Sequence, residues 1–384
     1  MRRRLGVVAL VIAIVAGGFT GGGYLYAQWK LSKVANLGTK GLVSQLGNKP
    51  FNILEIGSDS RAGLTGVAAG MTGAGAQTAG DNHSDVVKIM HINPVAGTIS
   101  EMSIPRDTMF TVIKNRAKNG KFNRINVNLA GGPSLVAQTI TANLGIPIAH
   151  IAVVSFGGII NASQAIGGIK MSFPYPARDL MSGLQVRNTG CRPLTNLQAL
   201  ALVRSRHFEW YEHGQWTEDV TSDYGRIYRQ NQFIKAFINK AKALWNPLTI
   251  NNLLSNLPQG VSLDRNFSLS DLISLALRFH SFNTNSLTSY TLPTAGGPGG
   301  VLGDVLYITQ PNAQQELTQV FGSQLLRPTN PPPNALGQTP MPPVITVPKP
   351  VKVTTSSTKH HPVTHHPVTT TTVEGDQYFD PKAC

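Results

Sequence analysis

The sequence predicts an α/β domain, in which strands and helices alternate along the chain and pack in layers. Two observations support this fold class. Short runs with the composition of buried strands are interleaved with longer segments whose apolar residues recur at helical spacing. Hydrophobic residues make up 41% of the 384 residues, which is ample for a core. At this length, one large domain with appended segments and two domains are both possible.

The predicted domain begins with strands. Residues 51–56, FNILEI, have the composition of a buried strand and end at the turn-prone segment 57–63, GSDSRAG. The next twenty residues are rich in Gly, Ala and Thr, and we expect them to form a flexible loop. Two further strands are predicted at 86–92 and 98–104, joined by an Asn-Pro turn.

Helices and strands alternate through the rest of the domain. A helix is predicted over 133–144, because a proline starts it, apolar residues recur every four positions and a glycine follows. Thr195 and Asp223 can cap two further helices, of which the second is long and has an apolar stripe. The other predicted elements are strands at 148–156 and 169–173 and helices at 269–279 and 313–325, so that the domain ends near Leu326.

The N-terminus has the pattern of a membrane segment. Residues 5–29 are uncharged and mostly apolar, and roughly 20 apolar residues span the hydrocarbon layer. Arginines at positions 2, 3 and 4 precede this run, so the positive-inside rule keeps the N-terminus in the cytoplasm and places the remainder outside. A cleaved signal peptide with Ala27 near its end is the alternative, although the apolar run exceeds the usual core of about 7–15 residues.

The sequence therefore predicts a single-pass protein of the cell membrane with four parts. Residues 1–30 form a cytoplasmic stub and a transmembrane signal anchor, followed by a juxtamembrane linker at 31–49. Residues 50–327 form the extracytoplasmic domain. Residues 328–384 are rich in Pro, Thr and His, which predicts a disordered tail. Its four closely spaced histidines could bind a transition metal, but a solvated tail is the simpler interpretation.

The chain contains two cysteines, Cys191 and Cys384. Two cysteines exclude a disulfide-rich scaffold and a multi-cysteine zinc module. In an oxidising exterior two thiols commonly pair, and such a bridge would fold the tail back onto the domain. Free thiols and an intermolecular bond are the alternatives.

The chain is strongly basic, with 33 Lys and Arg against 19 Asp and Glu and a formal net charge of +14. Charge alone would suggest a nucleic-acid-binding protein. The predicted topology places the domain outside the cytoplasm, so we expect no nucleic acid. The expected partners are instead the cytoplasmic membrane, phosphates and wall polymers.

Arginines occur beside acids or amides in a set of short segments. Near the start of the predicted helix at Asp223, Arg226, Arg229 and Gln230 share one side, where free N–H groups attract anions. An arginine fork donates two hydrogen bonds to one phosphate, so several forks can hold a pyrophosphate. The segments are SDSR at 58–61, IPRD at 104–107, RSR at 204–206 and DYGRIYRQ at 223–230.

Two aspartates accompany these arginines. Asp59 and Asp85 would be repelled by a phosphate unless a hard cation such as Mg²⁺ or Mn²⁺ lay between them. The sequence has no Ser/His/Asp nucleophile signature, Walker loop or HExxH zinc motif, which argues against those enzyme classes. The pattern therefore favours a metal-assisted phosphate site.

At these segments the sequence resembles the LytR-CpsA-Psr family of membrane-anchored envelope proteins. The resemblance covers roughly residues 51–245, and its specificity comes from the order and spacing of seven segments. These are NILEIGSDSR, SDVVKIMHINP, SIPRDT, NRINVNLAGGPSLVAQTITANLGI, IAVVSFGGIINASQAIGGI, LQALALVRSR and SDYGRIYRQNQFIKA.

The resemblance implies a phosphotransferase. Family members are thought to take a glycopolymer from an undecaprenyl-pyrophosphate carrier and join it through a phosphodiester to a peptidoglycan hydroxyl. The resemblance also implies the fold: an α/β/α sandwich with a mixed central sheet and a hydrophobic channel for the polyprenyl chain. The alternative is a non-catalytic protein that binds a polyprenyl phosphate or a wall polymer as a scaffold or regulator.

The resemblance also implies roles for individual residues. Asp59 and Asp85 match the carboxylates near Mg²⁺. The chemistry of phosphoryl transfer adds that Arg106 is expected to act in catalysis and that Asp107 or Asp85 could accept the proton of the sugar hydroxyl. Lys121 and Arg124 compete for one basic position, and Arg229 either binds the pyrophosphate or serves the structure. The residues expected at the pyrophosphate are Arg61, Arg106, Lys121, Arg124, Arg204, Arg206, Asp223, Arg226, Arg229 and Gln230.

One position departs from the family pattern. His83 stands where the family usually has an arginine before Ser-Asp. Histidine is mostly neutral at pH 7, so the site is expected to have one positive charge fewer and to bind diphosphate more tightly in acid. The alternative is a loop histidine without a role.

Overall fold

The computed structural model describes most of the chain from residue 25 to residue 333, together with the last eight residues. Residues 5–29, predicted to span the membrane, lie largely outside this part. The described residues are 23, 25–30, 32–44, 48–61, 64–72, 83–243, 251–252, 255–256, 260–268, 271, 274–275, 278–279, 281–333 and 377–384.

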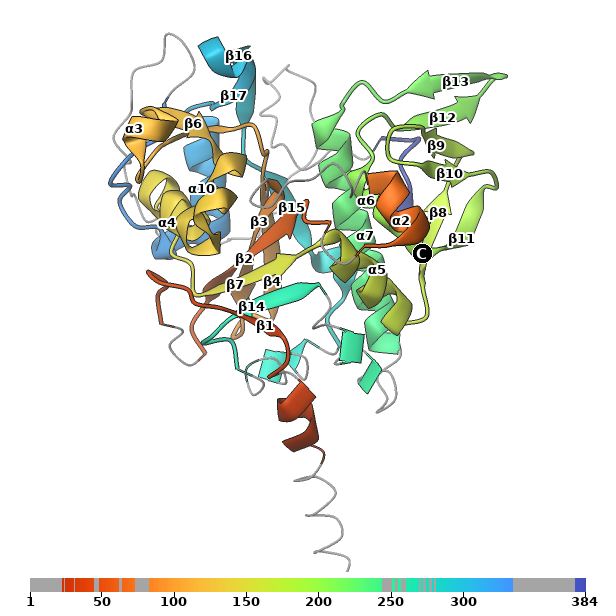
Figure 1. The fold of residues 1–384 in the computed structure, drawn as a ribbon, viewed down its shortest axis with the longest axis horizontal. Coiled ribbons are helices and arrows are strands. Elements are labelled where there is room, and N and C mark those ends of the chain that lie inside the picture. Colours follow the sequence, from red (N-terminus) through yellow and green to blue (C-terminus); the bar gives the residue numbers. More distant parts are fainter. Residues whose placement is uncertain are drawn as a thin grey trace, which may run out of the picture.

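A mixed seven-stranded sheet forms the centre of the molecule, with the order β1-β14-β7-β2-β3-β4-β15 (Figure 1). β2 pairs parallel with β7 and antiparallel with β3, which in turn pairs antiparallel with β4. The predicted strands at 51–56, 86–92, 98–104 and 148–156 are confirmed as members of this sheet. The strands are β1 (Ala35–Leu37), β2 (Phe51–Ser58), β3 (Ser84–Asn93), β4 (Thr98–Ile104), β7 (His150–Val154), β14 (Val261–Asp264) and β15 (Thr288–Thr291).

Helices lie on both sides of this sheet (Figure 1). Strand alternation directs Leu54 and Ile56 of β2 toward one side, where they join a core with α4 and α10. The helices on the other side pack around a second core with the smaller sheets. The predicted α/β/α layering is thus observed. The helices are α4 (Pro133–Leu144) and α10 (Asn312–Phe321) on the first side, and α5 (Phe156–Ala165), α6 (Asn196–Arg204) and α7 (Asp223–Ala243) on the second.

Smaller sheets and short helices complete the fold. Two of these sheets, β11-β8-β18 and β10-β9-β12-β13, lie beside α5, α6 and α7 (Figure 1). The strands are β5 (Met109–Thr111), β6 (Phe122–Arg124), β8 (Ile169–Phe173), β9 (Ala177–Asp179), β10 (Leu184–Val186), β11 (Gly190–Leu194), β12 (Glu209–Glu212), β13 (Gln215–Glu218), β16 (Thr294–Pro298), β17 (Asp304–Ile308) and β18 (Lys382–Ala383). The short helices are α2 (Gly66–Thr72), α3 (Arg116–Asn119), η2 (Ile125–Gly131), η4 (Thr284–Ser286), η5 (Gly300–Leu302) and η6 (Gly322–Gln324).

Local sequence signals explain several helix ends. Thr195 caps α6 in a capping box with Gln198, as the polar residue before the apolar run predicts. Gly145 follows α4 at φ +73°, a backbone conformation that glycine adopts without steric cost. The helix predicted over 269–279 lies partly outside the described residues.

The prediction of a flexible loop after residue 63 is wrong for its first part, because residues 66–72 form the helix α2. Leu64 and Met71 pack against the second core, and Thr72 is buried. Burial of these side chains outweighs the low helix propensity of the glycines.

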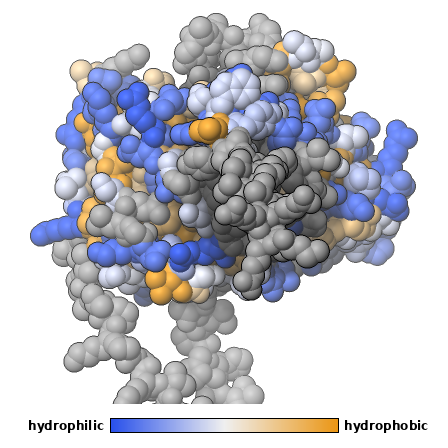
Figure 2. Space-filling model, turned by 90° about the horizontal axis from the view of Figure 1, so that it is seen from below, coloured by the Kyte–Doolittle hydropathy of each residue, from blue (hydrophilic) through white to orange (hydrophobic). Residues whose placement is uncertain are grey.

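The described surface seen from the N-terminal side is mostly hydrophilic, with small hydrophobic areas between (Figure 2). Within the part of the chain that the structure covers, no helix is both long and apolar enough to cross a membrane.

The C-terminal segment, residues 377–384, does not extend away from the domain. Cys384 is bonded to Cys191 of β11, and β18 pairs with β8. Phe379 stacks on Trp210 with ring centroids 3.8 Å apart. The predicted disordered tail is therefore wrong for these eight residues, because buried aromatic surface and the disulfide outweigh the loss of chain entropy. Residues 334–376 of that predicted tail lie outside the described part.

Replacing Cys384 with serine is expected to lower the free energy of unfolding by about 2–4 kcal/mol, because the bridge closes a loop between residues 193 positions apart. Urea unfolding followed by tryptophan fluorescence measures this change. Reductant should shift the wild-type midpoint to that of the variant and leave the variant unaffected. An unchanged midpoint in the variant would contradict a stabilising bridge.

Candidate functional site

A cavity of about 590 Å³ lies between the central sheet and the second helical side. Its walls come from β2, β3 and β7 on the sheet and from α5, α6 and α7 opposite. Charged residues line one region, and apolar side chains line much of the rest. The charged and amide residues are Glu55, Asp59, Arg61, His83, Asp85, Lys88, Arg106, Asn126, Arg204, Arg206, Arg226 and Gln230, and the apolar ones include Ile56, Val86, Val154, Phe156, Ile159, Val203, Phe233 and Ile234.

The antiparallel pairing of β2 and β3 brings the two aspartates together. Asp59 follows the end of β2, and Asp85 stands at the start of β3. Between them the strands approach closely at Gly57, where a Cβ atom would lie 2.7 Å from the Cβ of Val86. This contact explains the need for glycine there.

Asp59 is held by the loop that leads into β3. The backbone N–H of His83 donates to its Oδ1 at 2.9 Å, and the His83 Nδ1 lies 3.8 Å from Oδ2. Burial raises the pKa of Asp59, and the neighbouring charge of Asp85 adds to that increase. Neutralising cations nearby would favour its ionised form.

Arg106 reaches Asp85 because β4 runs antiparallel to β3. Val87 opposes Ile104, so Asp85 near the start of β3 and Arg106 just after β4 are neighbours. Nη1 of Arg106 lies 2.5 Å from Oδ1 of Asp85. Burial opposes the charge of Arg106, but Asp85 and Asp107 outweigh it and raise the pKa of the guanidinium.

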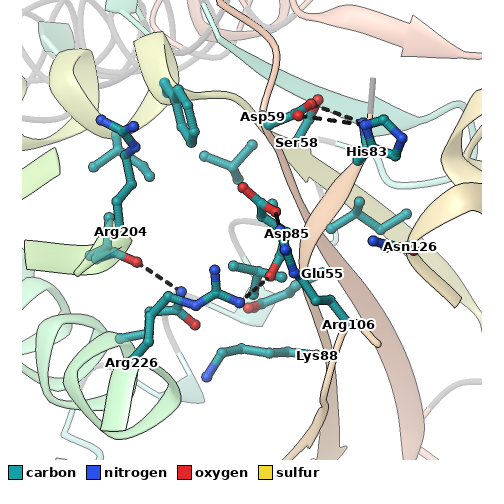
Figure 3. A pocket seen from close by; sticks show the side chains of 18 of the residues that line it. Glu55, Ser58, Asp59, His83, Asp85, Lys88, Arg106, Asn126, Arg204 and Arg226 are labelled. Atoms are coloured by element: carbon teal, nitrogen blue, oxygen red, sulfur yellow. Dashed lines mark hydrogen bonds and ion pairs between the residues drawn. The ribbon is translucent and has the colours of Figure 1, made fainter. Parts of the chain in front are cut away.

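Arg226 enters from the first turn of α7 (Figure 3). It is 4% exposed, and its Nη2 donates to the Asp85 carbonyl at 2.9 Å and lies 2.7 Å from the Asp223 carboxylate. Burial lowers the pKa of Arg226, so an anion in the cavity would stabilise its charge. Its buried Nε and the buried Oε1 of Gln230 have no hydrogen-bond partner among the described residues.

Two more arginines come from the end of α6. Arg204, its last residue, faces the same open space as Asp59 and Asp85 (Figure 3). Burial lowers its pKa, and the charge of Arg61 lowers it further. Nε of Arg206 lies 3.3 Å from the Asp223 carboxylate. The cavity wall thus gathers five arginines from four separate segments of the chain.

Several predicted site residues lie outside the cavity wall. Asp107 lies 3.5 Å from both Arg106 and Arg124, and Arg124 donates to the Asp304 carbonyl at 2.9 Å. Lys121 places its Nζ 5.1 Å from the Phe122 ring centroid. Asp223 does not line the cavity itself but holds Arg206 and Arg226.

Arg229 does not line the cavity, and its contacts fit the structural alternative. Its side chain is fully buried, and Nη1 lies 2.8 Å from Asp219 and 2.9 Å from Asp380. Helical periodicity predicts that Arg229 lies near Arg226 and Gln230. In the structure, however, its side chain points toward the C-terminal segment, where it contacts Asp380. Its guanidinium forms ion pairs with both carboxylates there.

Two charged residues of the cavity, Glu55 and Lys88, were not predicted. They oppose each other on β2 and β3, on the face that carries Gly57. Nζ of Lys88 lies 2.7 Å from Glu101 of β4 and also bonds to Asn231 of α7. Each apolar strand contains one of these charged residues, and this was the available signal. Charged residues are almost never buried unless they are paired, so their presence there indicates buried ion pairs or a polar cavity.

Glu55 makes stability depend on pH. Burial raises its pKa from 4.5 to about 7, with the charge of Glu101 adding to the increase and Lys88 opposing it. The folded state therefore binds more protons than the unfolded state between these pH values, so stability falls as pH rises through this range.

Replacing Glu55 with glutamine is expected to remove this loss, making the variant more stable than the wild type at pH 8 by about 1 kcal/mol or more. The two proteins should be similar near pH 5. Thermal unfolding at both pH values measures the difference. An equal difference in melting temperature at pH 5 and pH 8 would show that Glu55 does not titrate in this range.

The residues at the charged end fit a hard divalent cation. Asp59 and Asp85 offer carboxylate oxygens, which Mg²⁺ prefers, and Mg²⁺ sites commonly use one or two carboxylates with substrate phosphates. Among the described residues no group of three or more His, Cys, Asp or Glu could hold a metal. A cation here would therefore need oxygens from the ligand as well.

Known proteins share this architecture. The structure of a LytR-Csp2A-Psr enzyme from Actinomyces oris superposes with a TM-score of 0.59 at 20% identity, covering 77% of this chain and 97% of that one. B. subtilis TagV gives a TM-score of 0.54 at 21% identity, with 72% and 97% covered. TagT, solved bound to LI-WTA, gives 0.53 at 18% identity, with 76% and 97% covered. At these identities the likeness shows the fold.

Curated relatives are also similar in sequence. A probable cell wall biosynthesis protein, LcpB of Corynebacterium glutamicum, is 29% identical over 236 residues, which are 60% of this chain and 52% of the relative. The polyisoprenyl-teichoic acid–peptidoglycan teichoic acid transferase TagU of Halalkalibacterium halodurans is 30% identical over 194 residues, 50% of this chain and 53% of the relative. The chain thus spans about half the length of these two relatives. The model of the LytR_cpsA_psr family matches residues 26–321. Since this match covers most of the chain, the protein belongs to the LytR-CpsA-Psr family.

Proposed function

We propose that this protein is an extracytoplasmic phosphotransferase of cell wall biogenesis. It transfers a glycopolymer from a polyprenyl-pyrophosphate carrier to a hydroxyl of peptidoglycan and forms a phosphodiester. The relatives TagU are named as polyisoprenyl-teichoic acid–peptidoglycan teichoic acid transferases, which supports the reaction class.

The observation that carries the proposal is the two-part lining of the cavity. The arginine-rich end with Asp59 and Asp85 suits a diphosphate, because the guanidinium forks match phosphate geometry. The remaining wall, with Phe156, Ile159 and Phe233 among its apolar side chains, suits a polyprenyl chain. One ligand with a doubly charged head and an apolar chain satisfies both parts.

The reaction needs positioning and charge neutralisation more than covalent chemistry. The peptidoglycan oxygen bonds to the phosphorus that carries the glycopolymer, and the bond to the bridging oxygen breaks, releasing polyprenyl phosphate. Arg106 and Arg226 would take up the negative charge that develops on the leaving phosphate. Asp85 lines the cavity and Asp107 does not, so Asp85 is the better candidate to accept the hydroxyl proton.

Mg²⁺ or Mn²⁺ held by Asp59 and Asp85 would neutralise phosphate charge when bound. The raised pKa of Asp59 supports a site that gains from a cation, because a cation favours the ionised carboxylate. We further propose that residues 5–29 anchor the protein in the cytoplasmic membrane with its N-terminus inside. This orientation would keep the domain at the surface where lipid-linked donors are exposed.

Metal dependence provides the test of this site. Full-length protein in detergent is incubated with a labelled polyprenyl-pyrophosphate oligosaccharide and peptidoglycan, with Mg²⁺ or with EDTA. Label transfer is expected to stop in EDTA and to return with added Mg²⁺. Asp59→Asn should need more Mg²⁺ for half-maximal transfer, whereas Asp271→Asn, outside the cavity wall, should not. Donor binding without turnover in either condition would favour a non-catalytic binding protein.

A further inference from the structure

Two exposed aromatic rings lie outside the cavity, on the sheet β10-β9-β12-β13. Tyr211 of β12 and Trp216 of β13 are directly opposite each other, with ring centroids 5.3 Å apart. Tyr211 is 40% exposed and Trp216 is 38% exposed. Large aromatic side chains that are exposed side by side often mark a binding surface.

Strand geometry fixes the direction of both rings. Side chains alternate along β12, and the neighbouring Trp210 is buried against Phe379 of the C-terminal segment. Tyr211 and Trp216 therefore point to the opposite, outer face. The buried side packs against the domain, and the tight turn has positive φ at both His213 and Gly214, so the rings are presented on a well-supported hairpin.

Polar side chains surround the rings on the same outer face. Arg178 places its guanidinium 4.1 Å from the Trp216 centroid and pairs with Glu209. Glu218 lies 2.8 Å from His207. We call this surface the aromatic face; strand register assigns it Arg178, Gln185, Glu209, Tyr211, Trp216 and Glu218.

The chemistry of the aromatic face suits a neutral carbohydrate. The flat rings can contact the C–H faces of sugar rings, while amide, carboxylate and guanidinium groups can bond hydroxyls. Its one arginine, Arg178, is paired with Glu209, and Glu218 adds a second carboxylate, so the face offers little attraction to a polyanion. The face is unlike the arginine-rich cavity in this respect.

The hairpin is also connected to the cavity. It lies in the sequence between Arg206 and Asp223, and Nε of Arg206 is 3.3 Å from the Asp223 carboxylate. Tyr211 is five residues after Arg206, so their Cα atoms are at most about 18 Å apart. A polymer on the aromatic face would therefore lie near Arg206, which lines the cavity.

We propose that the aromatic face binds a neutral glycan strand and so holds the acceptor beside the cavity. This inference deepens the proposed function, on which it rests for the identity of the reaction. It adds a binding site that the phosphate chemistry does not require.

Binding to neutral glycan strands of β-1,4-linked N-acetylglucosamine (chitin oligosaccharides), which share the linkage of the peptidoglycan backbone but carry no charge, tests this site. Full-length protein in detergent is titrated with these strands without any donor. Tyr211→Ala with Trp216→Ala is expected to weaken binding at least tenfold, and Tyr211→Phe with Trp216→Phe should restore most of it. Leu180→Ala, which removes an exposed apolar side chain after β9, should bind as the wild type does. Melting temperatures check that each variant is folded.

The outcomes separate this inference from the proposed function. Loss of strand binding in the alanine variant would support the aromatic face even if no donor were ever turned over. Binding within twofold of the wild type would overturn it, whatever the transfer activity. The single variant Tyr211→Ala applies the same criterion if the double variant does not fold. Preference for an anionic polymer over the strands would also overturn it.

Discussion

Alanine in place of Arg106 is expected to reduce glycopolymer transfer at least about a hundredfold while the protein stays folded. The guanidinium lines the cavity, pairs with Asp85 at 2.5 Å and keeps enough exposure to meet a ligand. Its loss removes positive charge where the leaving phosphate would develop negative charge. It also leaves Asp85 to repel the diphosphate. Transfer of labelled glycopolymer to peptidoglycan measures the effect.

Arg116→Ala is the matched control for Arg106→Ala. Arg116 lies in α3, outside the cavity wall, and donates to the Val112 carbonyl and to Asn330. Its removal should change transfer by less than about twofold, with a similar small change in stability. Equal loss of transfer in both variants would mean that general basic charge, rather than the placement of Arg106, supports activity.

Replacement of Arg229 by methionine is expected to lower the free energy of unfolding by about 3–5 kcal/mol. Arg229 is fully buried between Asp219 and Asp380, and it donates to the Ser205 carbonyl at 3.2 Å. Methionine keeps much of the side-chain volume but leaves two buried carboxylates without their cation. Chemical denaturation at pH 7 measures the loss.

Lys240→Met, near the end of the same helix, is the control for Arg229→Met. This side chain is partly exposed, so a change below about 1 kcal/mol is expected. Asp380→Asn should destabilise less than Arg229→Met, because Asp219 still pairs with the guanidinium. Wild-type stability in Arg229→Met would show that the buried ion pairs contribute little.

Much of the fold and of the charged site follows from local patterns. The two strands predicted before and after the Asn-Pro turn already imply that Asp85 and Arg106 are neighbours. In an antiparallel pair, the start of the first strand lies beside the end of the second. The capping signal at Thr195, and Asp223 as the first residue of α7, likewise place Arg204 and Arg226 at helix ends. These features depend on interactions that are close in sequence.

Other features depend on distant partners and could not be predicted. Helical periodicity gives the angle of Arg229 about its axis, but the partner that buries it, Asp380, is 151 residues away. The pairing of Lys88 with Glu101 likewise requires the register of two strands. The hairpin of β12 and β13 had too few apolar residues in alternation to indicate a pair of strands.

Following both halves of the donor in one reaction tests whether this site catalyses phosphotransfer. A polyprenyl-pyrophosphate oligosaccharide is labelled in the sugar and in the phosphate next to it, and incubated with full-length protein, peptidoglycan and Mg²⁺. Both labels are expected to enter peptidoglycan together through a phosphodiester, and polyprenyl monophosphate is expected to be released in equal amount. Sugar transfer without its phosphate, or release of polyprenyl pyrophosphate, would contradict phosphotransfer at this site.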